Sequence, residues 1–231
     1  MPRRLPGLRA VGFDLDGTLV DTAPDLAAAM NGVLAALGAR TLPYERIRAM
    51  IGGGIEHLVA RALRASLGAE MAAEALQADA LARFRVTYGA RLYEDSRLYP
   101  GVLETLRSLA AEGLALGCVT NKHSAFSVPL LRAVGLEGVL GFTLCADRFE
   151  DRKPQPNLLL AACRLLGVPP RAMLYVGDSQ RDVQAAHAAG CRSALVTYGY
   201  GRSEEPAGPA ADILVDRLEE LDGLGSGPEV P

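Results

Sequence analysis

The stretch "VGFDLDGTLVDT", residues 11–22, decides both the fold and the chemistry of this chain. Its apolar start, within "RAVGFDL" at residues 9–15, predicts a buried strand. Three aspartates follow within eight positions: Asp14, Asp16 and Asp21. Carboxylates that share one site repel each other, and one of them normally takes up a proton. Because a bound cation removes that penalty, the crowding at the end of a buried strand indicates a metal site.

The composition excludes several classes of protein. The chain has 231 residues, of which 49% are apolar and 5% aromatic, with a formal net charge of -3. These values are typical of a helix-rich globular protein with a sizeable core, and they give no sign of a nucleic-acid partner. No apolar run reaches the length of a membrane span and the N-terminus lacks a secretory signal, so we expect a cytoplasmic protein without a membrane contact. The four cysteines are widely spaced and are expected to be buried thiols.

The segment after the first strand is helical by periodicity and propensity. A helix is predicted from Pro24 to Leu37 and ended by Gly38. Three further helical stretches follow, with Gly68 as the expected end of the second: "PYERIRAM", "GIEHLVARALRASLG" and "EMAAEALQADALARFRVTYGARL". We therefore predict an all-helical insertion over residues 21–93.

After "YPG" at residues 99–101, helices alternate with strands. The predicted strands are "LALGCVT", "VLGFTLCA", "AMLYVG", "SALVTYG" and "DILVD". This alternation predicts βαβ units, and hence an α/β fold with a doubly wound, mostly parallel, Rossmann-like sheet. The predicted core comprises residues 1–20 and 94–231, with the helical insertion after its first strand. The tail "GLGSGPEVP" is rich in glycine and proline and is expected to be loose.

Polar residues follow the predicted strands at the edge where open α/β sheets bind ligands. Asp14 and Asp16 follow the first strand, Thr120 and Asn121 follow "LALGCVT", and Asp178 follows "AMLYVG". The topology brings these strand ends to one edge of one sheet, so we expect their side chains to lie together. Carboxylate oxygens near phosphate favour Mg²⁺ over zinc. The side chains of Thr120 and Asn121 are hydrogen-bond donors for phosphate oxygens.

Two more residues belong to the same set. Lys153 lies in "DRKPQPN", just before a predicted helix, and supplies a positive charge that offsets the aspartates and attracts phosphate. Asp182 lies one helical turn after Asp178. A carboxylate in such a site also serves as a nucleophile in some ATPases, where it forms an aspartyl-phosphate.

Four segments of this chain resemble, in order and spacing, the four motifs of the haloacid dehalogenase superfamily: "DLDGTLVDT", "VTNK", "KPQP" and "GDSQRDV". The helical insertion resembles the cap of that superfamily, and the resemblance extends to about residue 222. It implies a Mg²⁺-dependent phosphatase in which Asp14 is the nucleophile and Asp16 the general acid and base. Asp16 favours phosphate chemistry, because dehalogenases of the superfamily do not carry it.

The same resemblance implies the remaining roles. Thr120 corresponds to the phosphate-binding hydroxyl, and Lys153 to the lysine that steadies the nucleophile and the phosphate. Asp178 completes a Mg²⁺ site with Asp14 and the backbone carbonyl of Asp16. Asp182 corresponds to a second acidic residue that lies near the metal without binding it directly.

Within the superfamily, "RAMIGGGIEHLVARAL" and "LVTYGYG" resemble phosphoglycolate phosphatases, which implies 2-phosphoglycolate as the phosphorylated small-molecule substrate. The chain departs from that pattern at Gly53, where those enzymes often have asparagine. Three alternatives stay open: a phosphatase for another small metabolite such as a sugar phosphate, a sugar phosphomutase, and a regulatory binding protein on an inactive hydrolase scaffold. The sequence leaves both a monomer and a homodimer open.

Other polar and glycine positions have simpler expected roles. Asp21 is expected to serve a turn or a helix cap. Residues 52–54, three glycines, are either a flexible break between helices or a loop that faces the substrate. Tyr198 and Tyr200 in "YGYG" are expected to pack rather than take part in catalysis.

Overall fold

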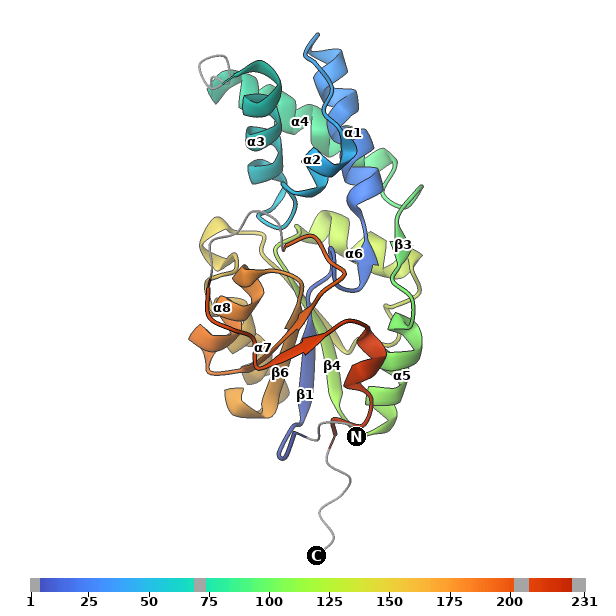
Figure 1. Ribbon diagram of the computed structural model, residues 1–231, viewed down its shortest axis with the longest axis vertical. Helices are drawn as coiled ribbons and strands as arrows, with labels where there is room; N and C mark the ends of the chain where they lie inside the picture. The colour runs from blue at the N-terminus through green and yellow to red at the C-terminus, as the bar shows by residue number, and fades with distance from the viewer. Residues whose placement is uncertain (1–4, 69–73, 202–207, 226–231) are drawn as a thin grey trace, which may run out of the picture.

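The computed structural model describes residues 5–68, 74–201 and 208–225, which form a layered α/β structure with helices above one end of the sheet (Figure 1). Six parallel strands lie in the order β5-β4-β1-β6-β7-β8. Their bounds are β1 Ala10–Phe13, β4 Ala115–Thr120, β5 Phe142–Cys145, β6 Met173–Gly177, β7 Arg192–Val196 and β8 Ile213–Val215. The predicted α/β, Rossmann-like fold class is confirmed. The last six residues of the predicted loose tail, 226–231, lie outside the described residues.

Helices cover both faces of this sheet. One face carries α5 Val102–Ala111, α6 Ser124–Ala133 and the 3-10 helix Leu218–Leu221, and the other carries α7 Asn157–Leu166 and α8 Gln180–Ala189. Side chains alternate along the central strand, so Val11 and Phe13 join the first hydrophobic cluster while Ala10 joins the second. Burial on both faces explains why the strands are near-continuous apolar runs.

Helix α6 begins directly after β4, because its N-cap is supplied three residues beyond the end of that strand. It begins at Ser124, because the side chain of His123 accepts a hydrogen bond from the backbone N–H of Ala125 at 3.1 Å. Pro129 therefore lies inside the helix rather than in its first turn.

The helical insertion consists of α1 Ala23–Ala36, α2 Tyr44–Arg48, α3 Ile55–Leu67 and α4 Glu74–Ala90. Its buried side chains form a third hydrophobic cluster, separate from the two that flank the sheet. Helix α3 illustrates why: Ile55, Leu58, Val59, Ala62 and Leu63 are buried at helical spacing and make one apolar face. None of the helices in the described part of the chain is both long and apolar enough to cross a membrane.

Two short strands connect the insertion to the sheet. Val20–Asp21 (β2) leads into the insertion and Arg97–Leu98 (β3) leads out of it, and the two pair in antiparallel fashion. Both are two residues long, too short for a periodic signal, and the sequence did not predict them. The pairing places the entry and exit of the insertion side by side.

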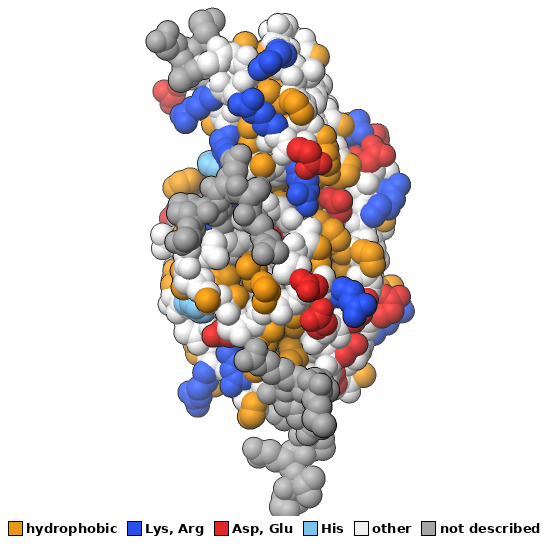
Figure 2. Space-filling view, viewed as in Figure 1, with side chains coloured by type: hydrophobic (Ala, Val, Ile, Leu, Met, Phe, Trp, Pro, Cys, Tyr) orange, Lys and Arg blue, Asp and Glu red, His pale blue; other side chains and the backbone are white. Residues whose placement is uncertain are grey.

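Figure 2 shows acidic and basic side chains intermixed over the described surface of both parts on the face in view.

Candidate active site

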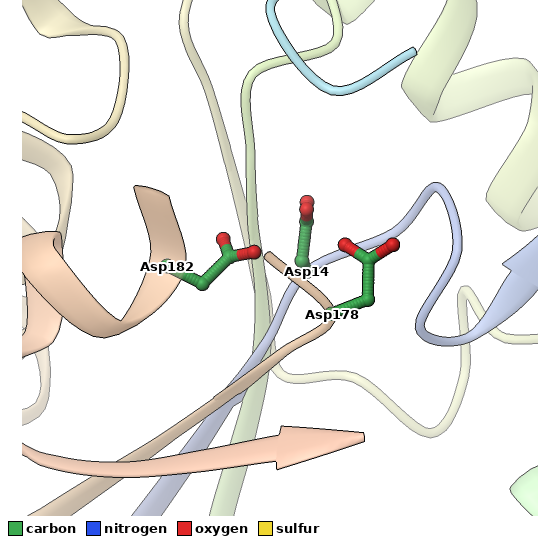
Figure 3. A group of neighbouring side chains, drawn as sticks. All are labelled: Asp14, Asp178 and Asp182. Atoms are coloured by element: carbon green, nitrogen blue, oxygen red, sulfur yellow. The ribbon is translucent and has the colours of Figure 1, made fainter. Parts of the chain in front are cut away.

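Three carboxylates converge at the carboxyl edge of the sheet. Asp14 follows β1, Asp178 follows β6, and Asp182 lies in the first turn of α8. Figure 3 shows their carboxylates pointing into one region, and one oxygen of each lies within 4.8 Å of the others. An all-oxygen set of this kind fits a hard divalent cation. Asp14 and Asp178 therefore lie close together at this edge, as the sequence predicts.

Burial makes this cluster costly without a cation. It raises the pKa of Asp14 to about 6, although Lys153 opposes the change. Burial, followed by the charges of Asp182 and Asp14, raises the pKa of Asp178 well above its ordinary value. Three carboxylates face one ammonium group, so ionisation leaves two negative charges uncompensated. A divalent cation would neutralise that excess, and the residues present therefore fit a metal such as Mg²⁺.

Lys153 forms ion pairs with two of the three carboxylates. Its Nζ lies 2.9 Å from Asp14 Oδ1 and 2.7 Å from Asp182 Oδ1, and it donates to the hydroxyl of Tyr175 at 2.7 Å. Burial alone would lower the pKa of this lysine, but Asp14 and Asp182 raise it above its ordinary value. Lys153 is therefore a permanent cation, and Tyr175 is a contact that the sequence did not reveal.

Asp182 is occupied on both oxygens. Oδ1 meets Lys153, while Oδ2 accepts from the backbone N–H of Ser179 at 3.0 Å and from its hydroxyl at 2.6 Å. These bonds form a capping box at the start of α8. This arrangement supports the expectation that Asp182 orients the site without binding the metal directly.

Asp178 is held by a loop whose backbone comes unusually close. The N–H groups of Tyr200 and Gly201 donate to its Oδ2 at 2.5 and 3.2 Å. A side chain at Gly199 would place its Cβ 2.2 Å from the Cβ of Asp178, and one at Gly17 would place its Cβ 2.3 Å from Asp178 Oδ2. Glycine is therefore required at both positions by space, and Gly17 also has a φ of +83°.

Asp16 lies apart from the three-carboxylate cluster. Lys122 Nζ contacts its two oxygens at 3.0 and 3.2 Å, and the hydroxyl of Thr22 donates to Oδ1 at 2.7 Å. Although burial would lower it, the charge of Asp16 raises the pKa of Lys122 above its ordinary value. Tyr88, from α4, contributes a ring whose centre lies 4.7 Å from Lys122 Nζ. Lys122 is the last residue of the "VTNK" motif, and no role for it followed from the sequence.

A cavity of about 30 Å³ lies between the sheet edge and the helical insertion. The sheet side contributes polar residues: Asp14, Asp16, Thr120, Asn121 and Lys122. The insertion contributes glycine and apolar residues: Leu26, Ile51, Gly52, Gly54, Ile55 and Leu58. Gly52 and Gly54 of the glycine loop thus face the cavity, which favours the second of the two roles expected for that loop.

The residues predicted to bind phosphate have different surroundings. Thr120 lines the cavity, and its hydroxyl accepts from the N–H of Lys122 at 3.2 Å. Asn121 instead ties loops together, because its Nδ2 donates to the carbonyls of Gly52 and Lys153 at 3.1 and 3.2 Å. Both of its amide hydrogens are thereby engaged, so a hydrogen bond from Asn121 to phosphate would require one of these contacts to break.

Asp21 has the capping role expected of it, with an unexpected partner. Its Oδ1 accepts from the N–H of Ala23 at 3.4 Å and from the hydroxyl of Tyr200 at 2.6 Å. Both tyrosines of "YGYG" are at least partly buried, as expected, but their hydroxyls also make specific hydrogen bonds. The four cysteines are free thiols.

Comparison with known proteins agrees with this geometry. Residues 11–196 match the family of haloacid dehalogenase-like hydrolases, so the chain belongs to that family. It is an enzyme of the phosphoric monoester hydrolase class. Phosphoglycolate phosphatase from Nitrosospira multiformis is 45% identical over 94% of this chain and 95% of its own length. The phosphoglycolate phosphatase from Thiobacillus denitrificans is 42% identical over 92% of this chain and 93% of its own length.

A solved structure gives the same result for the fold. The crystal structure of a predicted phosphoglycolate phosphatase from Haemophilus somnus superimposes with a TM-score of 0.87 and is 34% identical. The match covers 94% of this chain and 97% of that one, so it includes the helical insertion as well as the sheet.

Proposed function

We propose that the protein is a Mg²⁺-dependent phosphatase that hydrolyses 2-phosphoglycolate through an aspartyl-phosphate on Asp14. One observation carries the reaction: a buried carboxylate paired with Lys153 faces the same cavity as Thr120 and a second, separately held carboxylate, Asp16. The substrate is inferred from the names of the relatives described above.

Asp14 is the proposed nucleophile. Its Oδ1 accepts from the N–H of Leu15 at 2.7 Å and from Lys153 at 2.9 Å. These contacts fix the carboxylate and leave Oδ2 as the atom we assign to attack on phosphorus. The hydroxyl of Thr120, which lines the same cavity, would donate a hydrogen bond to the transferred phosphate. Lys153 keeps Asp14 ionised and supplies positive charge behind it.

Asp16 is the proposed general acid and base. In the first step Asp16 protonates the leaving alkoxide, and in the second it removes a proton from the water that attacks the aspartyl-phosphate. Lys122 and Thr22 hold its carboxylate apart from Asp14, so the two aspartates are chemically different although only two positions separate them.

Asp14, Asp178 and the backbone carbonyl of Asp16 would hold Mg²⁺, with Asp182 bound to Lys153 beside them. The ion would neutralise the negative charge of the carboxylates and the phosphate. Asp178 contributes from a fixed position, because two backbone N–H groups hold one of its oxygens.

The helical insertion is the proposed selector of the leaving group. We divide the chain into a core, residues 1–20 and 94–231, and a cap, residues 21–93. Residues of the insertion enclose this cavity on one side, which supports a compact leaving group. Helix α3 begins at this cavity without a side-chain N-cap, which favours a leaving group with a negative charge such as glycolate. The cytoplasmic location stays a prediction.

The test is a panel of small phosphate esters offered to the purified protein with Mg²⁺ and, in parallel, after chelation. The panel contains 2-phosphoglycolate, several sugar phosphates, an aryl phosphate and a sugar bisphosphate. We expect the highest kcat/KM for 2-phosphoglycolate and no turnover after chelation. A higher kcat/KM for a sugar phosphate would show that the sugar phosphate, and not 2-phosphoglycolate, is the substrate. Dependence on a sugar bisphosphate would indicate a mutase. No turnover of any ester would contradict the proposed reaction.

A further inference from the structure

We propose that Tyr200 is a positioning residue that couples the segment where the chain enters the helical insertion, residues 21–23 and here called the hinge, to the carboxylate of Asp178. The inference rests on the proposed function, because it takes Asp178 to be a ligand of the metal. It assigns Tyr200 a role beyond the packing expected from the sequence. Tyr200 makes contacts at both of its ends, through its hydroxyl and its backbone N–H, and the guanidinium of Arg48 lies over its ring.

The hydroxyl of Tyr200 closes the start of the insertion. Thr22 is the N-cap of α1 but forms no side-chain cap bond. The Tyr200 hydroxyl substitutes for it, accepting from the N–H groups of Thr22 and Ala23 at 2.7 and 3.0 Å. The same hydroxyl donates to Asp21 at 2.6 Å. One phenol therefore fixes the segment at which the chain passes from β2 into the insertion.

The backbone of Tyr200 holds the other partner. Its N–H donates to Asp178 Oδ2, and the neighbouring Gly201 N–H donates to the same oxygen. The absence of a Cβ at Gly199 lets this loop approach Asp178 that closely. A shift of the loop would therefore move the donors of a proposed metal ligand directly.

Helix α2 contacts the same loop from above. The guanidinium of Arg48 lies 5.0 Å from the ring centre of Tyr200 and donates to the carbonyl of Gly199 at 2.9 Å. Tyr200 itself is only 4% exposed and packs within the hydrophobic cluster of the insertion, although it belongs to the loop after β7. The insertion thus contacts this loop at the hydroxyl and the ring of Tyr200 and at the carbonyl of Gly199.

These contacts make hinge and metal site interdependent. If the insertion moves about β2, the Tyr200 hydroxyl either leaves the amides of Thr22 and Ala23 or carries residues 199–201 along with it. In the second case the position of Asp178 changes. Binding of Mg²⁺ and ordering of the hinge are then linked, and the linkage acts equally in both directions.

The experiment measures amide hydrogen exchange at Thr22 and Ala23 with and without Mg²⁺, in the wild type and in Tyr200→Phe. The variant keeps the ring beneath Arg48 and the backbone N–H to Asp178, and it loses only the hydroxyl. Tyr198→Phe is the matched control, since that tyrosine lies on the same loop and its hydroxyl donates to the Thr18 carbonyl at 2.8 Å.

We expect Mg²⁺ to slow exchange at both amides by about two- to tenfold in the wild type and in Tyr198→Phe, the range that one hydrogen bond gives. The slowing should be absent in Tyr200→Phe, and calorimetry should show Mg²⁺ binding weakened by a similar factor. Equal Mg²⁺ protection in Tyr200→Phe, or its loss in Tyr198→Phe, would overturn the coupling. Absence of Mg²⁺ binding by the wild type would instead overturn the metal site of the proposed function, and the coupling with it.

Discussion

The sheet edge and the helical insertion face the same cavity with opposite kinds of surface. The edge supplies carboxylates, a hydroxyl, an amide and an ammonium group from separate strand ends, whereas the described insertion residues at the cavity are glycine, leucine and isoleucine. The contrast indicates a division of labour. We propose that bonds are made and broken at the edge, while the insertion restricts the shape of the cavity and its access to water and contributes backbone rather than side-chain charge.

The largest effect should come from the edge, with Asp14→Asn. An amide is neutral and too weak a nucleophile to attack phosphorus, so we expect turnover to fall by about 10⁴ to 10⁶. No covalent phosphoenzyme should form, and Mg²⁺-dependent substrate binding should weaken less than turnover. Rapid-quench trapping of acid-stable protein-bound phosphate, beside steady-state kinetics, gives both results. A trapped phosphoenzyme in Asp14→Asn would assign the nucleophile to another residue.

Removing the insertion tests the other half of the comparison. Because Asp21 pairs with Arg97, an Asn-Gly turn in place of residues 22–96 should close a two-stranded hairpin there. The two clusters that flank the sheet contain no fully buried residue from the insertion among those described, so we expect the core to fold.

In that variant, turnover of an aryl phosphate should persist while the preference for 2-phosphoglycolate falls by roughly 100-fold. Circular dichroism and calorimetry check folding, and kcat/KM for both esters checks selectivity. If the folded variant kept the preference of the full chain, the edge itself would select the substrate and the comparison would break.

The sequence predicts the elements within each region better than it predicts the contacts between the two regions. Buried parallel strands are continuous apolar runs, and a polar residue at the end of each, such as Asp14 or Asp178, must lie at a shared edge. The fold class followed from this reasoning and is confirmed. The roles of the individual residues at the edge stay predictions that the geometry supports.

The contacts between the two regions could not be predicted from the sequence. Lys122 was visible within a motif, but only tertiary packing shows that it meets Asp16 and lies near the ring of Tyr88. The sequence predicts Tyr200 to be a packing residue, because nothing local reveals that its hydroxyl contacts Thr22, the N-cap of α1, which lies 178 positions away. Side chains that work between separately folded parts leave no periodic signal.

The pH dependence of Mg²⁺ binding should arise at the edge. Burial raises the folded-state pKa of Asp14 to about 6, so its ionisation removes stability from the metal-free protein as the pH rises from about 4 to about 6. Mg²⁺ requires the ionised form. The rise in Tm caused by Mg²⁺ should therefore be large at pH 7 to 8 and shrink below pH 6.

At a hundredfold excess over Kd we expect a rise of about 5 to 10 °C at neutral pH. Calorimetric scans at pH 5, 6, 7 and 8, with Mg²⁺ and with chelator, provide the measurement. Asp14→Asn serves as the control, since it should lose most of the Mg²⁺-dependent rise. A Mg²⁺ effect of equal size at pH 5 and pH 8 would contradict the raised pKa.

The smallest effect should come from the charged contact between the regions. Glu56, in the first turn of α3, accepts from Arg152 of the core at 2.6 Å and from Arg85 of α4 at 3.1 Å. Burial pushes its pKa up, but hydrogen bonds from its own backbone and from Arg152 lower the pKa of Glu56 below its ordinary value overall. The pair joins insertion to core beside the glycine loop, since Arg152 lies against Gly54.

Because its side chain is 36% exposed, this ion pair contributes little, and Glu56→Gln should raise KM by roughly two- to fivefold with kcat nearly unchanged. The matched control is Glu137→Gln. This substitution removes a solvent-exposed ion pair with Arg132, both of whose partners belong to the sheet domain, and it should change neither KM nor kcat. High salt should reproduce the Glu56→Gln effect in the wild type, because screening weakens the same contact. A loss of kcat beyond tenfold would show that the insertion supplies charge to the reaction, and the division between chemistry at the edge and shape in the insertion would then be wrong.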